Sequence, residues 1–325
     1  MRLLRFAPVA LLAAALALPA AAQSRRDTGF DLVQLDPSAR AAALAGAPGA
    51  LAGDDPTAAF YNPALLTGAM SRSVSAGYLN HVADISAGTL LYARDVPRLG
   101  ATLAASLRFL SYGDFDRTAP DGTTDGTFGA SETALTISAA REVAPRLRAG
   151  VNLHALSASL DDASAFALAG DVGATYEVPS QSLVLGASVH HLGTTLSSLG
   201  SERDRLPVDL RLTAAKGLRY LPLTISVAGY DLQGIEGVSA GDSSAVRRAL
   251  DHVAVGGELQ LGRALALRVG YNPRRADDLR SGGRLDLAGV SAGFGLSLSR
   301  FALDYAFNGW SQYGGLHQFG LRTRL

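Results

Sequence analysis

The sequence contains no cysteine among its 325 residues. This absence excludes a disulfide framework, a thiol nucleophile, a thiolate zinc site and an acylated N-terminal cysteine. Lysine is almost absent too, because Lys216 is the one lysine in the chain. The 29 basic residues balance the 29 acidic ones, and only 18% of residues are charged, where a soluble protein has about a quarter. A neutral chain lacks the basic footprint of a nucleic-acid binder, so we expect no nucleic-acid partner.

The chain also lacks an apolar run of the roughly 20 residues that a membrane-spanning helix needs. Its longest apolar run, Phe6–Leu18, follows the basic start Met1–Arg5 and precedes the small residues of Pro19–Ala22. A basic start, a short apolar run and small residues are typical of a secretory signal peptide. We therefore predict a signal peptide over residues 1–22. A spanning helix is the alternative, and the run is too short for it.

From about Ser71 onward, apolar side chains alternate with small or polar ones in segments of roughly 9 to 14 residues. A period of two belongs to strands, and about 9–11 residues suffice for a strand to cross a membrane. We therefore predict an all-β fold, a 14-stranded antiparallel transmembrane outer-membrane β-barrel over residues 71–325. The expected strands are 71–80, 85–94, 99–110, 130–141, 146–159, 164–177, 182–192, 207–217, 222–231, 250–261, 264–272, 287–298, 300–308 and 316–325.

Tight turns alternate with mostly longer connections between these strands. The longest connections are 111–129, 193–206, 232–249 and 273–286. Bacterial outer-membrane barrels have short periplasmic turns and longer outer loops. We therefore expect extracellular loops, periplasmic termini, and contact with outer-membrane lipid and lipopolysaccharide. A soluble sandwich or barrel is the alternative, but it needs no such one-sided asymmetry.

Residues 23–70 do not alternate. Ser38–Leu44 follows Asp36-Pro37 and predicts a short helix capped by Ser38 or Asp36. A second helical turn after Asp54-Asp55-Pro56 is interrupted at Asn62-Pro63, because proline disfavours helix at the preceding residue. A fourteen-stranded barrel leaves a lumen that its wall side chains do not close. We therefore predict a small N-terminal helical plug over 23–70; a segment hanging in the periplasm is the alternative.

Few residues in the sequence are candidates for catalysis or metal binding. Ser239 and Ser291 each lie in a Gly-x-Ser-x-Gly match, but neither stands between a buried strand and a helix as a nucleophile does. His190 and His191 are adjacent on an expected strand, so they should face opposite sides, which is poor geometry for one metal. We predict no catalytic, cofactor-binding or metal-ligating residue and no cofactor, and hence that the protein is not an enzyme.

Several motifs resemble the PorV/PorQ family of type IX secretion barrels, which is related to FadL-like transporters. They are Asp36–Leu44, Asp54–Leu65 with its Asn62-Pro63-Ala64 turn, Ser111–Arg117, Gly126–Ser131, Leu267–Asn272 and Ser299–Tyr305. The Tyr-Gly-Asp-Phe phrase at 112–115 is most similar to the PorQ branch, and the Asn-Pro-Ala turn is shared with FadL-like barrels generally. The resemblance implies a non-enzymatic barrel whose outer loops hold a PorZ-like surface protein of the attachment complex, with PorU and PorV.

The expected partner-binding residues lie in the long loops. They are Tyr112, Asp114, Phe115, Arg117, Phe128, Arg203, Arg205, Arg274 and Arg275. The alternative function is a FadL-like channel for hydrophobic small molecules, which requires an apolar pocket in the lumen and a lateral opening at a kinked strand. The inward residues of the expected strands are mostly small, hydroxylated or charged, and this favours the docking role over the channel.

Overall fold

The computed structural model describes residues 29–81, 85–118, 122–200, 204–235, 243–280, 286–310 and 314–325, without the side chains of 243–246. The expected signal peptide and Arg203 lie outside these residues. No helix in the described part of the chain is long and apolar enough to cross a membrane.

The described residues form one closed antiparallel barrel in which β1 pairs with both β2 and β14. Each of the remaining strands pairs with its two neighbours in the chain, so the predicted fourteen-stranded barrel is confirmed. The strands are β1 (Ser73–Asn80), β2 (Ser86–Val96), β3 (Ala101–Thr118), β4 (Thr124–Ala144), β5 (Leu147–Leu160), β6 (Ala163–Val178), β7 (Leu183–Ser197), β8 (Asp209–Gly217), β9 (Leu223–Gly229), β10 (Val253–Leu261), β11 (Leu265–Tyr271), β12 (Val290–Ser297), β13 (Phe301–Gly309) and β14 (Gly315–Arg324).

The barrel is apolar outside and largely polar inside. On β5, Leu153 is 66% exposed on the outer face, whereas its neighbour Asn152 is fully buried in the lumen. Ile137 on β4 is 65% exposed and the preceding Thr136 is buried. Leucine, valine and phenylalanine occupy the outer face of most other strands in the same way. Exposure of so much apolar surface is stable only in hydrocarbon, so the fold is that of a membrane-spanning barrel.

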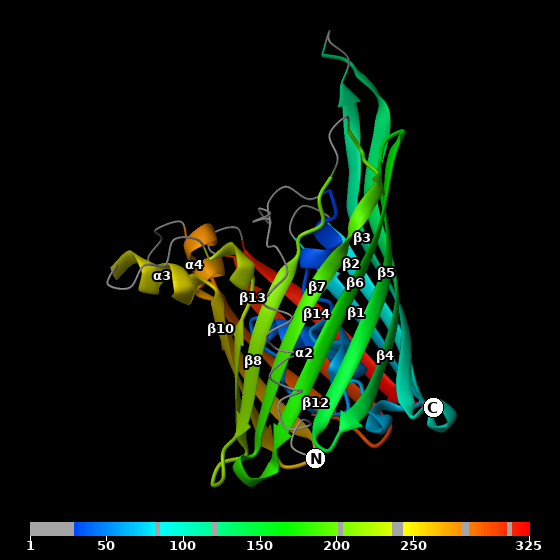
Figure 1. Ribbon diagram of the computed structural model, residues 1–325. Helices are drawn as coiled ribbons and strands as arrows, with labels where there is room; N and C mark the ends of the chain where they lie inside the picture. The colour runs from blue at the N-terminus through cyan, green and yellow to red at the C-terminus, as the bar shows by residue number, and fades with distance from the viewer. Residues whose placement is uncertain are drawn as a thin grey trace.

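One wall of the barrel is much taller than the other. Strands β3 to β7 have 14 to 21 residues, whereas β8 to β13 have 7 to 9. The hairpin of β3 and β4 rises far above the rest of the wall (Figure 1). The expected loop 111–129 is therefore mostly strand, which corrects the prediction. Its residues pair across the hairpin, for example Phe115 with Phe128, although two bulges interrupt the register.

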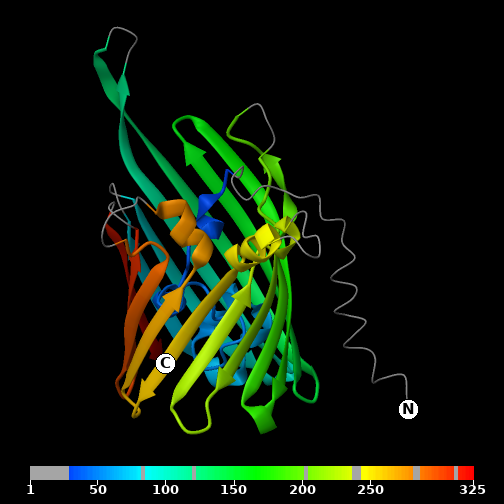
Figure 2. The ribbon, with the colours of Figure 1, turned by 90° about the vertical axis from the view of Figure 1, so that its left-hand side faces the viewer.

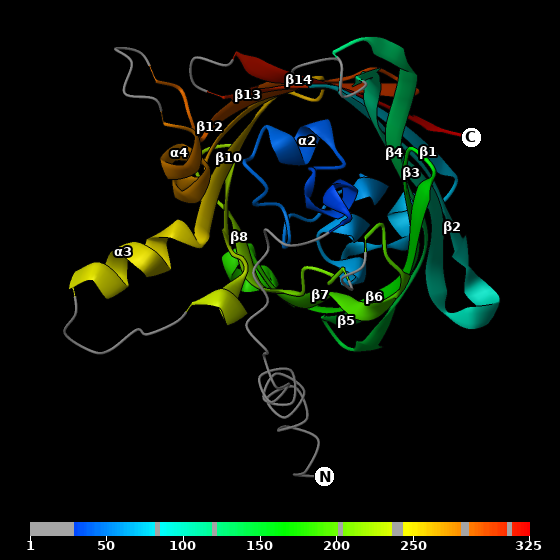
Figure 3. The same ribbon diagram turned by 90° about the horizontal axis from the view of Figure 1, so that it is seen from above.

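Two helices stand above the short wall (Figure 2). They are α3 (Ser243–Asp251) and α4 (Pro273–Leu279), and they occupy parts of the expected loops 232–249 and 273–286. Asn272 caps α4, since its side chain accepts a hydrogen bond from the backbone N–H of Arg275. Seen from above, α3 extends away from the ring of strands (Figure 3).

Residues 29–70, called the N-terminal segment below, lie inside the ring of strands (Figure 3). Its short elements are η2 (Asp31–Gln34), α2 (Ala39–Ala42), η3 (Pro56–Phe60), η4 (Pro63–Leu65) and η5 (Gly68–Met70). Helix α2 falls within the expected Ser38–Leu44 helix, and Asp55 caps η3. We call the end of the barrel with the β3–β4 hairpin the hairpin end and the opposite end the short-turn end. The first described residues lie at the hairpin end, because Phe30 packs with Leu110 and Leu316. Leu325 lies at the short-turn end, beside Arg72.

Candidate functional site

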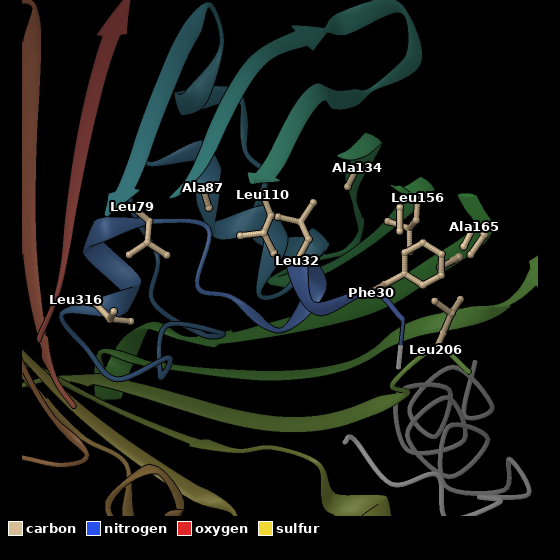
Figure 4. Close-up of a cluster of buried hydrophobic side chains, with 13 residues drawn as sticks. Phe30, Leu32, Leu79, Ala87, Leu110, Ala134, Leu156, Ala165, Leu206 and Leu316 are labelled. Atoms are coloured by element: carbon tan, nitrogen blue, oxygen red, sulfur yellow. The ribbon is translucent and has the colours of Figure 1, made fainter. Parts of the chain in front are cut away.

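A cluster of apolar side chains fills the lumen near the hairpin end. We call it the lumenal cluster. Its members come from β1 to β6, β14, the loop before β8 and the N-terminal segment: Phe30, Leu32, Leu79, Ala87, Leu110, Ala134, Leu156, Ala158, Ala165, Ala167, Ala169, Leu206 and Leu316. Figure 4 shows Phe30 directed toward Leu156 and Ala165, and Leu32 toward Leu110.

The inward side chains at this level of the barrel are mostly alanine, in agreement with the expected small inner face, but four strands each add a leucine, so the face is apolar here rather than polar. Each strand here contributes at most one leucine and at most three alanines to the lumen, so no single segment is strongly apolar. Closure of the barrel brings these residues together. A cavity beside Leu32, Leu35 and Gly77 has a volume of about 10 Å³, which is room for about one water molecule. Phe30 and Leu32 therefore occupy the space that an apolar ligand could take.

Two charged wall residues hold the backbone of the N-terminal segment at this place. The Glu132 carboxylate accepts hydrogen bonds from the backbone N–H of Asp31 (3.1 Å) and of Leu32 (2.8 Å). Arg108 Nη2 donates to the carbonyl oxygens of Leu32 (2.6 Å) and Leu35 (2.9 Å). Hydrogen bonds to charged groups are stronger than neutral ones. Because the wall binds the main chain, the side chains of Phe30 and Leu32 remain directed into the cluster.

The Asn62-Pro63-Ala64 turn packs against β5, β6 and β7, nearer the short-turn end of the barrel than the lumenal cluster. Asn62 is fully buried; its Oδ1 accepts from the backbone N–H of Ala64 (3.0 Å), and its Nδ2 donates to the carbonyls of Ala174 (3.1 Å) and Ala187 (3.4 Å). The turn lies over strand glycines that leave room for it. A Cβ at Gly150 would stand 2.4 Å from the carbonyl carbon of Pro63, and one at Gly173 would stand 2.2 Å from Asn62 Oδ1.

An ion network fastens helix α2 to the opposite wall. Arg40 donates twice to Glu258 on β10 (2.7 and 2.9 Å), and Arg268 Nε donates to the same carboxylate (2.7 Å). Burial disfavours the charged form of Arg40, but Glu258 more than offsets this and raises the pKa of the guanidinium above its ordinary value. Arg40 is therefore a permanent cation here, and loss of Glu258 would leave that charge buried without its main partner.

Tyr61 and Asp36 join two parts of the N-terminal segment. The Tyr61 hydroxyl donates to Asp36 Oδ1 (3.1 Å). Burial and the nearby Asp36 carboxylate both disfavour the tyrosinate, so the pKa of Tyr61 is raised above its ordinary value. The hydroxyl thus remains a donor at any physiological pH.

Strand β7 carries a bulge at mid-wall. Gly170 pairs with Leu192 and Val172 with Val189, so His190 and His191 lie opposite the single residue Asp171. The backbone of His191 has a φ of 58°, in the left-handed region that side chains rarely adopt. The expectation that the two histidines face opposite sides is wrong because of this bulge. Their rings lie 5.9 Å apart, and the His191 ring lies 6.1 Å from that of His154.

The pairing of β7 with β8 ends at this bulge. Its register runs from Leu183 with Lys216 to His190 with Asp209, and above it no residue of β7 pairs with β8 among those that the structure describes. Irregular chain lies beside upper β7 instead: Thr195 Oγ1 donates to the carbonyl of Asp204 (2.5 Å), and His191 Nδ1 lies 3.0 Å from the carbonyl oxygen of Pro207. Leu206, in the same stretch, belongs to the lumenal cluster. A short irregular segment therefore lies where the β7–β8 pairing ends, and one of its side chains belongs to the cluster.

The expected partner-binding residues fall into several groups. Asp114, Phe115, Arg117 and Phe128 lie on the tall hairpin, where the rings of Phe115 and Phe128 stack at 5.4 Å. Tyr112 instead packs against the lumenal cluster and donates a hydrogen bond to Glu132 (2.6 Å). Arg205 precedes Leu206 beside upper β7, and Arg203 lies outside the described residues.

Arg274 and Arg275, on α4, are turned inward rather than presented to a partner. They bind Asp231 (2.6 Å) and Asp36 (3.2 Å). Burial lowers the pKa of Arg274, but the hydrogen bond to Asp231 outweighs this and raises it.

Sequence reasoning missed Arg108, Glu132 and Asp171. Each of these residues occupies an inward-facing position in the alternation pattern of its strand. A charged residue at such a position could have identified each of them as a candidate functional residue. Their partners are backbone groups or residues far away in sequence, which the alternation pattern does not reveal.

Comparison with known proteins gives a fold relationship. No family model and no curated protein matches the sequence, so the resemblance to the PorV/PorQ family rests on motifs alone. Among solved structures, the Pseudomonas putida toluene transporter TodX is 13% identical, with a TM-score of 0.57 over 87% of this chain and 95% of that chain. The CymD monoaromatic hydrocarbon channel is 12% identical, with a TM-score of 0.55 over 91% and 99%. A Pseudomonas aeruginosa FadL homologue is 12% identical, with a TM-score of 0.52 over 87% and 97%. At these identities the likeness concerns the fold, which is that of FadL-type barrels.

Proposed function

We propose that this barrel lies in an outer membrane and admits small hydrophobic molecules, as a non-enzymatic channel. The observation that carries this proposal is the lumenal cluster, because apolar side chains from the wall surround Phe30 and Leu32, and displacement of these two side chains would leave an apolar pocket. The similarity in fold to hydrocarbon channels supports the same function. The proposal therefore favours the FadL-like channel, which was the alternative prediction from the sequence, over the secretion role.

The route that we propose has two steps. An apolar molecule enters from the hairpin end and displaces Phe30 and Leu32 from the lumenal cluster. It then leaves sideways into the membrane between β7 and β8, above the His190–Asp209 pair, where the irregular residues 204–208 lie beside upper β7 among those that the structure describes. Opening here breaks no inter-strand ladder, so it costs less than separating two paired strands.

Uptake of an apolar fluorescent dye by cells with and without the gene tests the function. We expect loss of the gene to slow uptake at least fivefold and the cloned gene to restore it. Equal uptake in the two strains would overturn the proposal.

A reversible lock tests the route. The chain has no cysteine, so a pair at Thr195 and Asp204 introduces the only thiols. We expect the oxidised pair to block uptake and a reducing agent to restore it, with the two single-cysteine variants as matched controls. Undiminished uptake by the oxidised pair would exclude this exit.

A second candidate function is docking of a surface protein, such as the PorZ-like partner implied by the PorV/PorQ resemblance. The tall hairpin favours it, since Phe115 is 43% exposed on a ribbon standing clear of the barrel (Figure 1). Photo-crosslinking from position 115 in the native host tests this role. Capture of one surface protein that is lost in a Phe115→Asp variant supports docking; no adduct above the background of an unmodified strain contradicts it.

A further inference from the structure

The Asp171 carboxylate lies at the centre of the β7 bulge. It is 2% exposed, and its Oδ1 accepts the backbone N–H of His191 at 2.9 Å. That N–H belongs to the bulged residue, which has no backbone acceptor on β6 because the two strands are out of step there. An unpaired buried N–H is destabilising. Asp171 thus supplies the acceptor that the regular ladder cannot supply.

The other carboxylate oxygen of Asp171, Oδ2, lies within hydrogen-bond distance of three side chains. Asn152 Nδ2 lies 2.8 Å, His154 Nε2 2.9 Å and His190 Nδ1 3.2 Å from Oδ2. Each imidazole meets a hydroxyl at its second nitrogen, Thr136 Oγ1 for His154 (2.8 Å) and Ser188 Oγ for His190 (2.8 Å). A carboxylate only accepts, so the ring nitrogen of each histidine that faces Asp171 donates to it, and the buried carboxylate is fully satisfied.

The same cluster reaches the N-terminal segment. Asn152 Nδ2 also donates to the carbonyl of Ala59 at 3.0 Å, and Ser188 Oγ lies 3.4 Å from the carbonyl oxygen of Tyr61. These two carbonyls come just before the Asn62-Pro63-Ala64 turn. A movement of the segment therefore alters the donors of Asp171, and through Asp171 the support of the His191 backbone.

We infer that Asp171 is a positioning residue, which holds the β7 bulge, sets the point where β7 leaves β8, and couples that point to the docking of the N-terminal segment. As far as transport is concerned, the inference rests on the proposed function, because the end of β7–β8 pairing is the proposed exit. The bulge itself can be measured without any transported molecule.

The test compares hydrogen exchange and dye uptake in two variants of Asp171. Asp171→Ala removes the acceptor of the His191 N–H. We expect exchange in a peptide covering residues 189–193 to rise at least tenfold and uptake to fall at least fivefold. Asp171→Asn keeps an oxygen for this N–H, and both imidazoles can switch tautomer toward the new NH₂ group because a hydroxyl either donates or accepts. The Asn152 Nδ2 group has no such alternative and loses its acceptor at position 171. The variant should therefore keep exchange within threefold of the unmodified protein and restore only part of the uptake.

Asp304→Ala is the matched control. Asp304 is a lumen-facing aspartate on β13, bound to Arg268 and flanked by regular pairing to β12 and β14. We expect no change of exchange in residues 189–193 for this variant. A heat-dependent gel shift of each variant checks that the barrel is closed.

Unchanged exchange at 189–193 in Asp171→Ala, or an equal rise in Asp304→Ala, would overturn the inference. If the unmodified protein transports no dye while Asp171→Ala still loosens the bulge, the proposed function fails and the positioning of the bulge by Asp171 stands.

Discussion

Replacing Gly150 with alanine should release the N-terminal segment while leaving the barrel intact. The added Cβ would lie 2.4 Å from the carbonyl carbon of Pro63 and 2.5 Å from the backbone nitrogen of Ala64. Unbonded carbon atoms prefer about 3.5–4.0 Å, so the turn must retreat by about 1 Å. It cannot do so by rotating a side chain, because the obstructed atoms are backbone. Such overpacking costs about 1–3 kcal/mol, which multiplies the undocked population by about 5 to 150.

Trypsin provides the assay, because Arg40 is the only lysine or arginine between residues 29 and 70. Docked Arg40 is held by Glu258, so cleavage after it reports the undocked segment. Gly257→Ala is the control, since a Cβ there would meet its nearest neighbours at 3.7 and 3.8 Å, which is ordinary contact. We expect at least fivefold faster cleavage in Gly150→Ala only, with both variants keeping the gel shift of a closed barrel. Cleavage at the unmodified rate in a closed Gly150→Ala barrel would refute the close approach on which this reasoning depends.

Three further predictions concern the same segment. Phe30→Ala empties part of the lumenal cluster, at a cost of about 3–5 kcal/mol for a buried phenylalanine, and should strengthen binding of an apolar dye relative to the unmodified protein; absence of any fluorescence gain contradicts it. Asn62→Ala removes the donor to Ala174 and Ala187 and should raise tryptic cleavage after Arg40 by the equivalent of about 1–3 kcal/mol, and unaltered cleavage would count against that anchor. Because the docked state raises the pKa of Tyr61, the undocked segment loses its tyrosine proton first, so docking should weaken as pH rises above about 10. Subtilisin cleavage should show this alkaline loss in the unmodified protein but not in Tyr61→Phe, and identical pH profiles would exclude Tyr61 as its cause.

Local patterns predicted the wall and the turn well. The alternation of Phe301, Leu303 and Tyr305 with small or polar neighbours fixes which side chains face outward, because strand geometry places successive residues on opposite faces. Pro56 and Pro63 likewise mark the starts of η3 and η4, each behind a capping side chain. The same logic failed at His190 and His191, where one extra residue in β7 changes the face. It also failed at 111–129, whose glycines and aspartates read as a loop although cross-strand pairing extends the hairpin.

The period of two within each strand was enough to predict a barrel with an apolar exterior, because each strand carries that information locally. The content of the lumen depends instead on tertiary contacts. Leu79, Leu110, Leu156 and Leu316 are single inward leucines on separate strands, and they form one apolar cluster only when the ring closes around Phe30. The bulge depends in the same way on Asp171 meeting the His191 amide across two strands. Both features arise from contacts between residues distant in the chain, and no local pattern encodes them.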